Sequence, residues 1–161
     1  MRDPLDRGSS SAAAGATAVA RRSLFERLGG RPVLERVHRL FYDRIYAHPW
    51  LKQYFAAIDQ KHIEKQQTDF MSFAMGGPAL YGGRLVPKAH EHVMITTEMI
   101  ELRTAMLKAS LDEAAVPPEL QQEWLRIDGA FEKVLTKGSL AECQPRYDGD
   151  AILDFPRPPF A

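Results

Sequence analysis

Apolar residues recur with helical spacing through most of this chain, and no segment shows the apolar–polar alternation typical of a half-buried strand. The clearest run lies between Pro32 and Pro49. Proline is favoured in the first turn of a helix and disfavoured within one, so this pair predicts both ends of a helix. Its apolar face comprises Val33, Leu34, Val37, Leu40, Phe41 and Ile45. The spacing therefore predicts an all-α fold.

Capping signals mark further helices before and after this one. Ser23 to Glu26 matches the capping box S-x-x-E, and Gly29-Gly30 predicts the end of the short helix that it begins. An aromatic turn is expected over residues 48–58. Later helices are expected over residues 60–75 behind Asp59, from Thr96 or Thr97 to about Ala115, and from Pro117-Pro118 to Gly138.

The composition indicates one globular domain and argues against strongly anionic partners. Of 161 residues, 21 are Lys or Arg and 21 are Asp or Glu, so the formal net charge is zero. No general field attracts nucleic acid or an anionic membrane. No apolar run reaches the ~18 to 20 residues of a membrane span, and no segment resembles a signal peptide. The single cysteine, Cys143, can form no internal disulfide, which agrees with a reducing compartment. Together these features predict a cytoplasmic protein.

The two ends of the chain differ in composition from its middle. Residues 1–22 are largely Ser, Ala, Gly and Arg without apolar periodicity, which predicts a disordered tail. An organelle-targeting peptide is the alternative, although Asp3 and Asp6 argue against it. Residues 23–138 are expected to form the helical domain. Residues 139–161 hold prolines among acidic and aromatic residues and predict an extended tail.

The stretch Leu80 to Ile95 carries the first candidate functional residue. Gly82-Gly83 free the backbone to turn, Pro87 can open a short helical turn, and His90 follows before an apolar run. A neutral imidazole held in this way can bind a metal. The alternative is that His90 is one of five histidines and lies near a loop by chance.

Two polar residues adjoin apolar helix faces. The hydroxyl of Tyr42 would point into the interior or along its edge, where a buried tyrosine usually bonds a nearby carbonyl. Gln67 interrupts the stripe of Ile63, Phe70 and Ala74. Either this edge of the stripe is wet, or a buried amide serves a ligand. His62 and Gln66 flank the same stripe and are expected in solvent.

The order of these features resembles the truncated haemoglobins, in particular their first group. The segments that carry the resemblance are LFERLGG (24–30), Phe41-Tyr42, FAMGGPALYGG (73–83) and AHEHVMIT (89–96). It extends from Leu24 to Leu135, and the intervals between Phe41 and Ile95 fit the family without insertion or deletion. The resemblance implies a two-over-two helical sandwich that holds haem b, iron protoporphyrin IX.

The same resemblance implies a role for each candidate residue. His90 corresponds to the proximal iron ligand, and Tyr42 and Gln67 to the pair that donates hydrogen bonds to a bound gas. The other positions expected around the haem are Phe55 wedged against it, Ile63 on the distal side, Tyr81 near a propionate, and Ile95 and Met99. His92 is the rival ligand, and His62 the candidate for the sixth coordination position.

Two positions depart from the family's pattern. Arg103 falls where an apolar or aromatic residue generally faces the haem, and burying an unpaired guanidinium is costly. It can reach a propionate instead, or the register of that helix can differ. Met71 stands where a phenylalanine can line a gas tunnel, so the sequence predicts nothing about tunnel gating.

The resemblance implies reversible binding of dioxygen, nitric oxide or another diatomic gas. The expected chemistry is nitric oxide dioxygenation, with an electron-donating reductase restoring ferrous iron. One alternative is a non-enzymatic oxygen carrier or a gas or redox sensor. The other is a helical interaction domain without haem, in which His90, Tyr42 and Gln67 coincide by chance.

Overall fold

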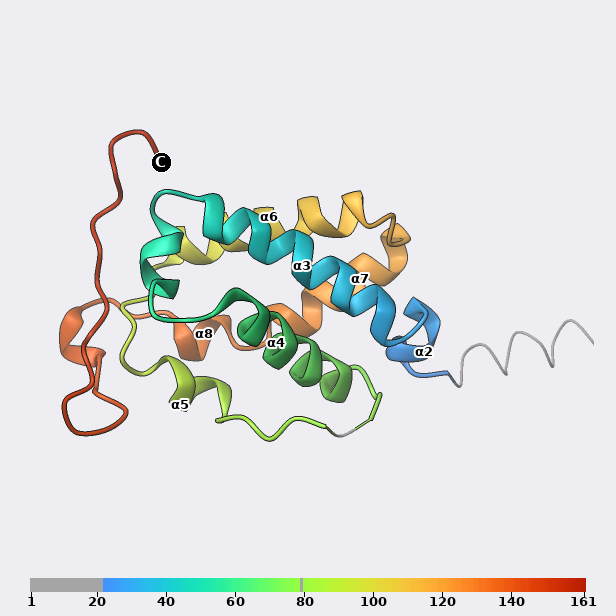
Figure 1. The fold of residues 1–161 in the computed structure, drawn as a ribbon, viewed down its shortest axis with the longest axis horizontal. Coiled ribbons are helices and arrows are strands. Elements are labelled where there is room, and N and C mark those ends of the chain that lie inside the picture. Colours follow the sequence, from blue (N-terminus) through green and yellow to red (C-terminus); the bar gives the residue numbers. More distant parts are fainter. Residues whose placement is uncertain (1–21, 79) are drawn as a thin grey trace, which may run out of the picture.

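The regular secondary structure of the described residues is helical, as the sequence predicts. A computed structural model describes residues 22–78 and 80–161, so the tail predicted over residues 1–22 lies, except for Arg22, outside the described residues. The helices, shown in Figure 1, are α2 (Leu24–Leu28), α3 (Arg31–Ala47), the 3-10 helix η1 (Leu51–Phe55), α4 (Gln60–Ala74), α5 (Val86–His90), α6 (Thr97–Glu113), α7 (Pro118–Gly129), α8 (Glu132–Leu135) and the 3-10 helix η2 (Leu140–Glu142).

Extended pairing is limited to one place in the described part of the chain. Val93 and Leu153 form an isolated parallel bridge, and these two ranges contain no strand. None of the described helices combines the length and the apolar character that a bilayer crossing requires.

The predicted capping signals form as expected. Ser23 and Glu26 make a reciprocal capping box at the start of α2. Gly29 ends α2 with φ 98°, a left-handed conformation that favours glycine. Asp59 accepts a hydrogen bond from the backbone N–H of His62 at 2.9 Å, and Thr96 caps α6.

The helices pack as the predicted two-over-two sandwich. Helix α3 packs against both α4 and α6, and α7 packs against α6 and α2 (Figure 1). The side chains at the centre of this packing are fully or almost fully buried; they include Leu34, Val37, Ile45, Met71, Leu107, Leu111 and Trp124. The apolar spacing that predicts the helices also brings their buried faces together.

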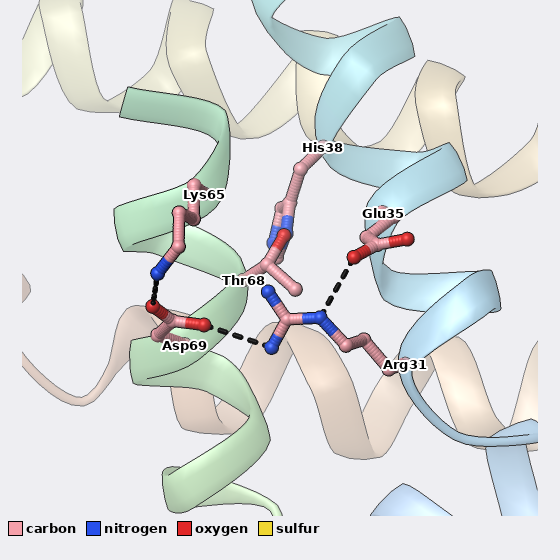
Figure 2. A network of polar contacts seen from close by, with 6 residues as sticks. All are labelled: Arg31, Glu35, His38, Lys65, Thr68 and Asp69. Atoms are coloured by element: carbon pink, nitrogen blue, oxygen red, sulfur yellow. Dashed lines mark hydrogen bonds and ion pairs between the residues drawn. The ribbon is translucent and has the colours of Figure 1, made fainter. Parts of the chain in front are cut away.

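A polar network fastens α3 to α4 on one side of the sandwich (Figure 2). The Asp69 carboxylate accepts from Arg31 at 2.8 Å and from Lys65 at 2.6 Å, and Arg31 also donates to Glu35. Deeper between the two helices, Nδ1 of His38 lies 2.7 Å from the Thr68 hydroxyl oxygen. These contacts hold the two helices together independently of any ligand.

The last predicted helix is wrong in its extent. The sequence predicts one helix from Pro117-Pro118 to Gly138, but α7 ends at Gly129 and the separate turn α8 begins at Glu132. Glycine is a weak helix former, and the break places Phe131 against Phe70, with ring centroids 5.7 Å apart. The apolar period continues through the break because both pieces face the same interior.

Residues 139–161 run along the end of the molecule opposite α2 (Figure 1). The Trp50 indole N–H donates to the Phe155 carbonyl at 2.7 Å. The Tyr54 hydroxyl donates to the same carbonyl and accepts from the Phe155 N–H at 3.0 Å. Leu153 and Phe155 are partly buried against the core. This stretch, here called the C-terminal segment, is thus packed onto the helical domain.

Candidate functional site

A cavity of about 350 Å³ lies between α3, α4, α5, α6 and the α7–α8 break, within the ~300 to 1,000 Å³ typical of ligand pockets. Its wall is mostly apolar and aromatic. All the residues that the sequence nominates for the site line it: Tyr42, Phe55, Ile63, Gln67, Tyr81, His90, Ile95 and Met99. The structure therefore brings them together, while their individual roles stay predictions.

His90 is held in one tautomer at the end of α5. Its Nδ1 lies 2.8 Å from the Val86 carbonyl, which can only accept, so Nδ1 carries the proton. Burial lowers the pKa of His90 from its ordinary value and favours the neutral imidazole. Nε2 then keeps its lone pair, and it makes no hydrogen bond to the described residues. This is the arrangement of a metal-ligating histidine.

The backbone that follows His90 is tied to residues beyond α8. Lys137 Nζ donates to the carbonyls of His90 at 3.1 Å and Val93 at 2.7 Å. The backbone N–H groups of Gln144 and Leu153 donate to the carbonyls of Glu91 and His92, each at 2.8 Å. Each carbonyl in the histidine loop (residues 90–93) therefore has a partner from after α8.

Tyr42 and Gln67 both carry polar groups in the cavity wall. Tyr42 is 4% exposed, and its ring meets that of Phe55 edge-on at 6.0 Å. Burial raises the pKa of Tyr42, so its hydroxyl stays protonated and can donate. Neither this hydroxyl nor the Gln67 amide forms a hydrogen bond with the described residues. Polar groups in an apolar wall normally have partners, so a ligand is the expected one.

The competing histidines differ in position. His92 is buried, lines the same cavity, and has an Nδ1 without a partner in the described ranges, so it stays the rival ligand. His62 is exposed and does not belong to the cavity wall. Gln66 is also exposed, as the sequence predicts, but it lies at the cavity's edge.

Arg103 lines the cavity and is paired, an outcome that the sequence does not predict. Its Nη1 and Nη2 donate to the two carboxylate oxygens of Asp128 at 2.5 and 2.9 Å. Its guanidinium carbon also lies 5.0 Å from the centroid of the Phe41 ring. The sequence could have indicated an acidic partner for Arg103, because Asp128 lies four residues after Trp124 and so on the same inward face of α7.

Other cavity residues escape the sequence analysis. Arg84 stands at the exposed rim, where its carbonyl accepts from the Tyr81 hydroxyl at 2.6 Å. Arg146 reaches the cavity from the C-terminal segment and is paired with Asp150 at 2.7 Å. No apolar pattern precedes Arg146, so only the folded chain reveals its position.

The residues fit haem better than a bare metal ion. Within residues 22–78 and 80–161, no group of three or more His, Cys, Asp and Glu side chains is arranged to hold a metal. A single imidazole is enough for haem, because the macrocycle itself supplies four nitrogen ligands to the iron. The mostly apolar wall suits its ring, and Arg84 at the rim suits its carboxylates.

Comparison with known proteins gives a consistent assignment. A family model described as bacterial-like globin matches residues 23–135. A group 1 truncated haemoglobin of Tetrahymena thermophila is 30% identical over 105 residues, which cover 65% of this chain and 87% of that protein. One from Mycolicibacterium paratuberculosis is 32% identical over 103 residues, covering 64% and 76%.

Solved structures agree with these relatives. The truncated haemoglobin of Tetrahymena pyriformis in its Fe(III) form is 28% identical and superposes with a TM-score of 0.67, covering 71% of this chain and 98% of that one. A group II truncated haemoglobin from Bacillus anthracis, 22% identical, has a TM-score of 0.67 with 72% and 92% coverage and supports the fold alone.

Proposed function

The chain belongs to the bacterial-like globins, as a truncated haemoglobin, and is therefore a haem- and oxygen-binding protein; from this premise we propose that the cavity would hold haem b, with His90 as the residue that would bind its iron. The observation that supports this role for His90 is its tautomer. The Val86 carbonyl fixes the proton on Nδ1, and the lone pair of Nε2 is left for iron. Nδ1 of His92, by contrast, has no hydrogen-bond partner among the residues that the structure describes.

Tyr42 and Gln67 serve as hydrogen-bond donors to the bound gas. A dioxygen ligand with partial negative charge would accept hydrogen bonds from a hydroxyl and an amide. Each net hydrogen bond contributes ~0.5 to 1.5 kcal/mol. Because ~1.4 kcal/mol is tenfold, two donors slow gas loss by about one to two orders of magnitude. Ile63 neither donates a hydrogen bond nor binds iron.

The reaction that we propose is nitric oxide dioxygenation. When bound, ferrous haem would supply the one electron needed as dioxygen and nitric oxide combine to nitrate, and an electron-donating reductase would restore the ferrous state. The chain's own contribution is to hold dioxygen with Tyr42 and Gln67 and to keep the cavity apolar with Phe55 and Ile63, which line it. Carriage or sensing without turnover is the competing function.

The haem site is tested with histidine variants of the haem-loaded protein. Wild type is expected to give a five-coordinate high-spin absorption spectrum in the ferrous, gas-free state. His90→Ala should lose or greatly weaken the axial bond and recover it with added imidazole, while His62→Ala, the matched surface control, keeps the wild-type spectrum. Loss of the axial bond in His92→Ala instead of His90→Ala would overturn the assignment.

Turnover is tested separately by mixing the oxygenated protein with nitric oxide in a stopped-flow instrument. Dioxygenation predicts stoichiometric nitrate and repeated cycles when a ferric reductase and its reductant are present. Nitric oxide that merely replaces dioxygen, with no nitrate formed, would favour carriage or sensing.

A further inference from the structure

In the ion pair between Arg103 and Asp128, the arginine is the more exposed member. The Arg103 side chain is 30% exposed and the Asp128 side chain 8%, although both residues line the cavity. The carboxylate side chain is therefore almost covered by the protein, and the Arg103 side chain forms most of the accessible part of the pair. An approaching ligand meets mainly the positive member.

Asp128 uses only some of the N–H groups of Arg103. A guanidinium has five N–H donors, and Asp128 accepts from one on each of Nη1 and Nη2. The remaining donors have no acceptor among the residues that the structure describes. Asp128 and the Phe41 ring hold the group in position, so little entropy is lost when a ligand accepts from it.

The position of Arg103 argues against a role with the haem propionates. Those carboxylates extend from the edge of the ring and stay solvated, and the exposed edge of the cavity already has Arg84 beside Tyr81. Arg103 instead contacts Phe41, which is 2% exposed and directly precedes Tyr42. Its charge reaches Tyr42, whose pKa it lowers against the larger effect of burial.

We propose that Arg103 makes the interior of this cavity a binding site for small monovalent anions that coordinate ferric haem. The proposal rests on haem binding in this cavity. Charge-assisted hydrogen bonds are shorter and stronger than neutral ones, and the apolar wall strengthens the attraction. Asp128 orients the guanidinium and offsets part of its charge. Nitrate, the product of the proposed reaction, belongs to the same chemical class.

The test is titration of the ferric haem-loaded protein with sodium azide and sodium fluoride, followed by absorption. The double variant Arg103→Leu/Asp128→Leu removes both charges and leaves no carboxylate unpaired. We expect its Kd for each anion to rise at least about tenfold over wild type, since ~1.4 kcal/mol is tenfold. Its Kd for carbon monoxide in the ferrous state is the reference and should change much less. Asp128→Asn keeps the cation and should bind both anions several-fold more tightly than wild type.

A matched control uses the pair of Arg44 and Glu113, which also joins two helices but does not line the cavity. Arg44→Leu/Glu113→Leu should keep both anion Kd values within about twofold of wild type. Unchanged anion affinities in the cavity double variant, with its haem absorption intact, would overturn the proposal. If that variant does not fold, Asp128→Asn decides: equal or weaker anion binding also overturns it. Wild type without a haem band would instead refute haem binding itself.

Discussion

Tyr42 and Tyr54 both line the cavity, but their hydroxyl groups have different surroundings. That of Tyr54 is bonded to the backbone of Phe155, whereas that of Tyr42 has no partner in the described part of the chain. Tyr42→Phe should therefore speed dioxygen dissociation about two- to tenfold, the effect of one lost net hydrogen bond of ~0.5 to 1.5 kcal/mol. Flash photolysis or stopped-flow displacement measures this rate.

Tyr54→Phe is the matched control, because it removes the same atom. It should lower the free energy of unfolding by ~1 to 3 kcal/mol, since two hydrogen bonds to Phe155 are lost, and leave the dioxygen dissociation rate near that of wild type. A faster rate in this variant equal to that of Tyr42→Phe would contradict the role given to Tyr42.

The buried His38 should make the stability of the protein depend on pH. Burial lowers its pKa from 6.5 to about 3, so the folded protein holds it neutral beside Thr68. Between these two values the unfolded chain binds more protons, and the free energy of unfolding falls as pH is lowered below 6.5, by up to ~1.4 kcal/mol per unit. In His38→Gln this contribution is absent, so its urea midpoint should fall less between pH 7 and pH 5 than that of wild type. The other histidines are common to both proteins. Equal falls in urea midpoint for wild type and His38→Gln would therefore show that His38 does not cause the pH dependence of stability.

The C-terminal segment couples to the histidine loop through its backbone. Phe155 packs edge-on against Tyr54 with ring centroids 5.0 Å apart, two residues after Leu153 meets His92 and Met94. Phe155→Ala should loosen this contact, lower stability by ~1 to 3 kcal/mol and accelerate haem loss several-fold. Transfer of haem to an excess of a second apoglobin measures the rate. Phe160→Ala, a control at a side chain that is 99% exposed, should match wild type in both measurements.

Helices and their caps follow from local sequence, but contacts between elements follow only in part. The capping box at Ser23 and the apolar stripes depend on neighbouring residues, so periodicity predicts them. The hydrogen bonds from Gln144 and Leu153 to the histidine loop join backbone groups, which every residue carries. No side-chain pattern in the sequence therefore predicts them. The break after Gly129 depends on how Phe131 packs on Phe70. The cavity residues that the sequence nominates were predictable because the family resemblance places each of them individually, whereas Arg84 and Arg146 were not.

At the scale of the molecule, the sandwich has a part that needs no ligand and a part that faces the cavity. Helix α4 belongs to both. Thr68 and Asp69 connect it to α3, while Ile63, Gln67 and Phe70 line the cavity from its other side. The two parts should therefore respond differently when haem is removed.

Haem extraction should lower the melting temperature on the order of 10 °C, because a ligand at a thousandfold excess over its Kd adds ~4 kcal/mol to the folded state. Hydrogen exchange should rise most in residues 80–95, where α5 and the histidine loop lose their contact with the ring, and least in α3 around Leu34 and Val37, which are fully buried. Mass spectrometry of the haem-loaded and extracted proteins, side by side, measures both regions. Readdition of haem should restore protection in wild type and only weakly in His90→Ala. A uniform rise across all helices would mean that haem supports the whole core, and that the contacts between α3 and α4 are not sufficient to hold these helices together.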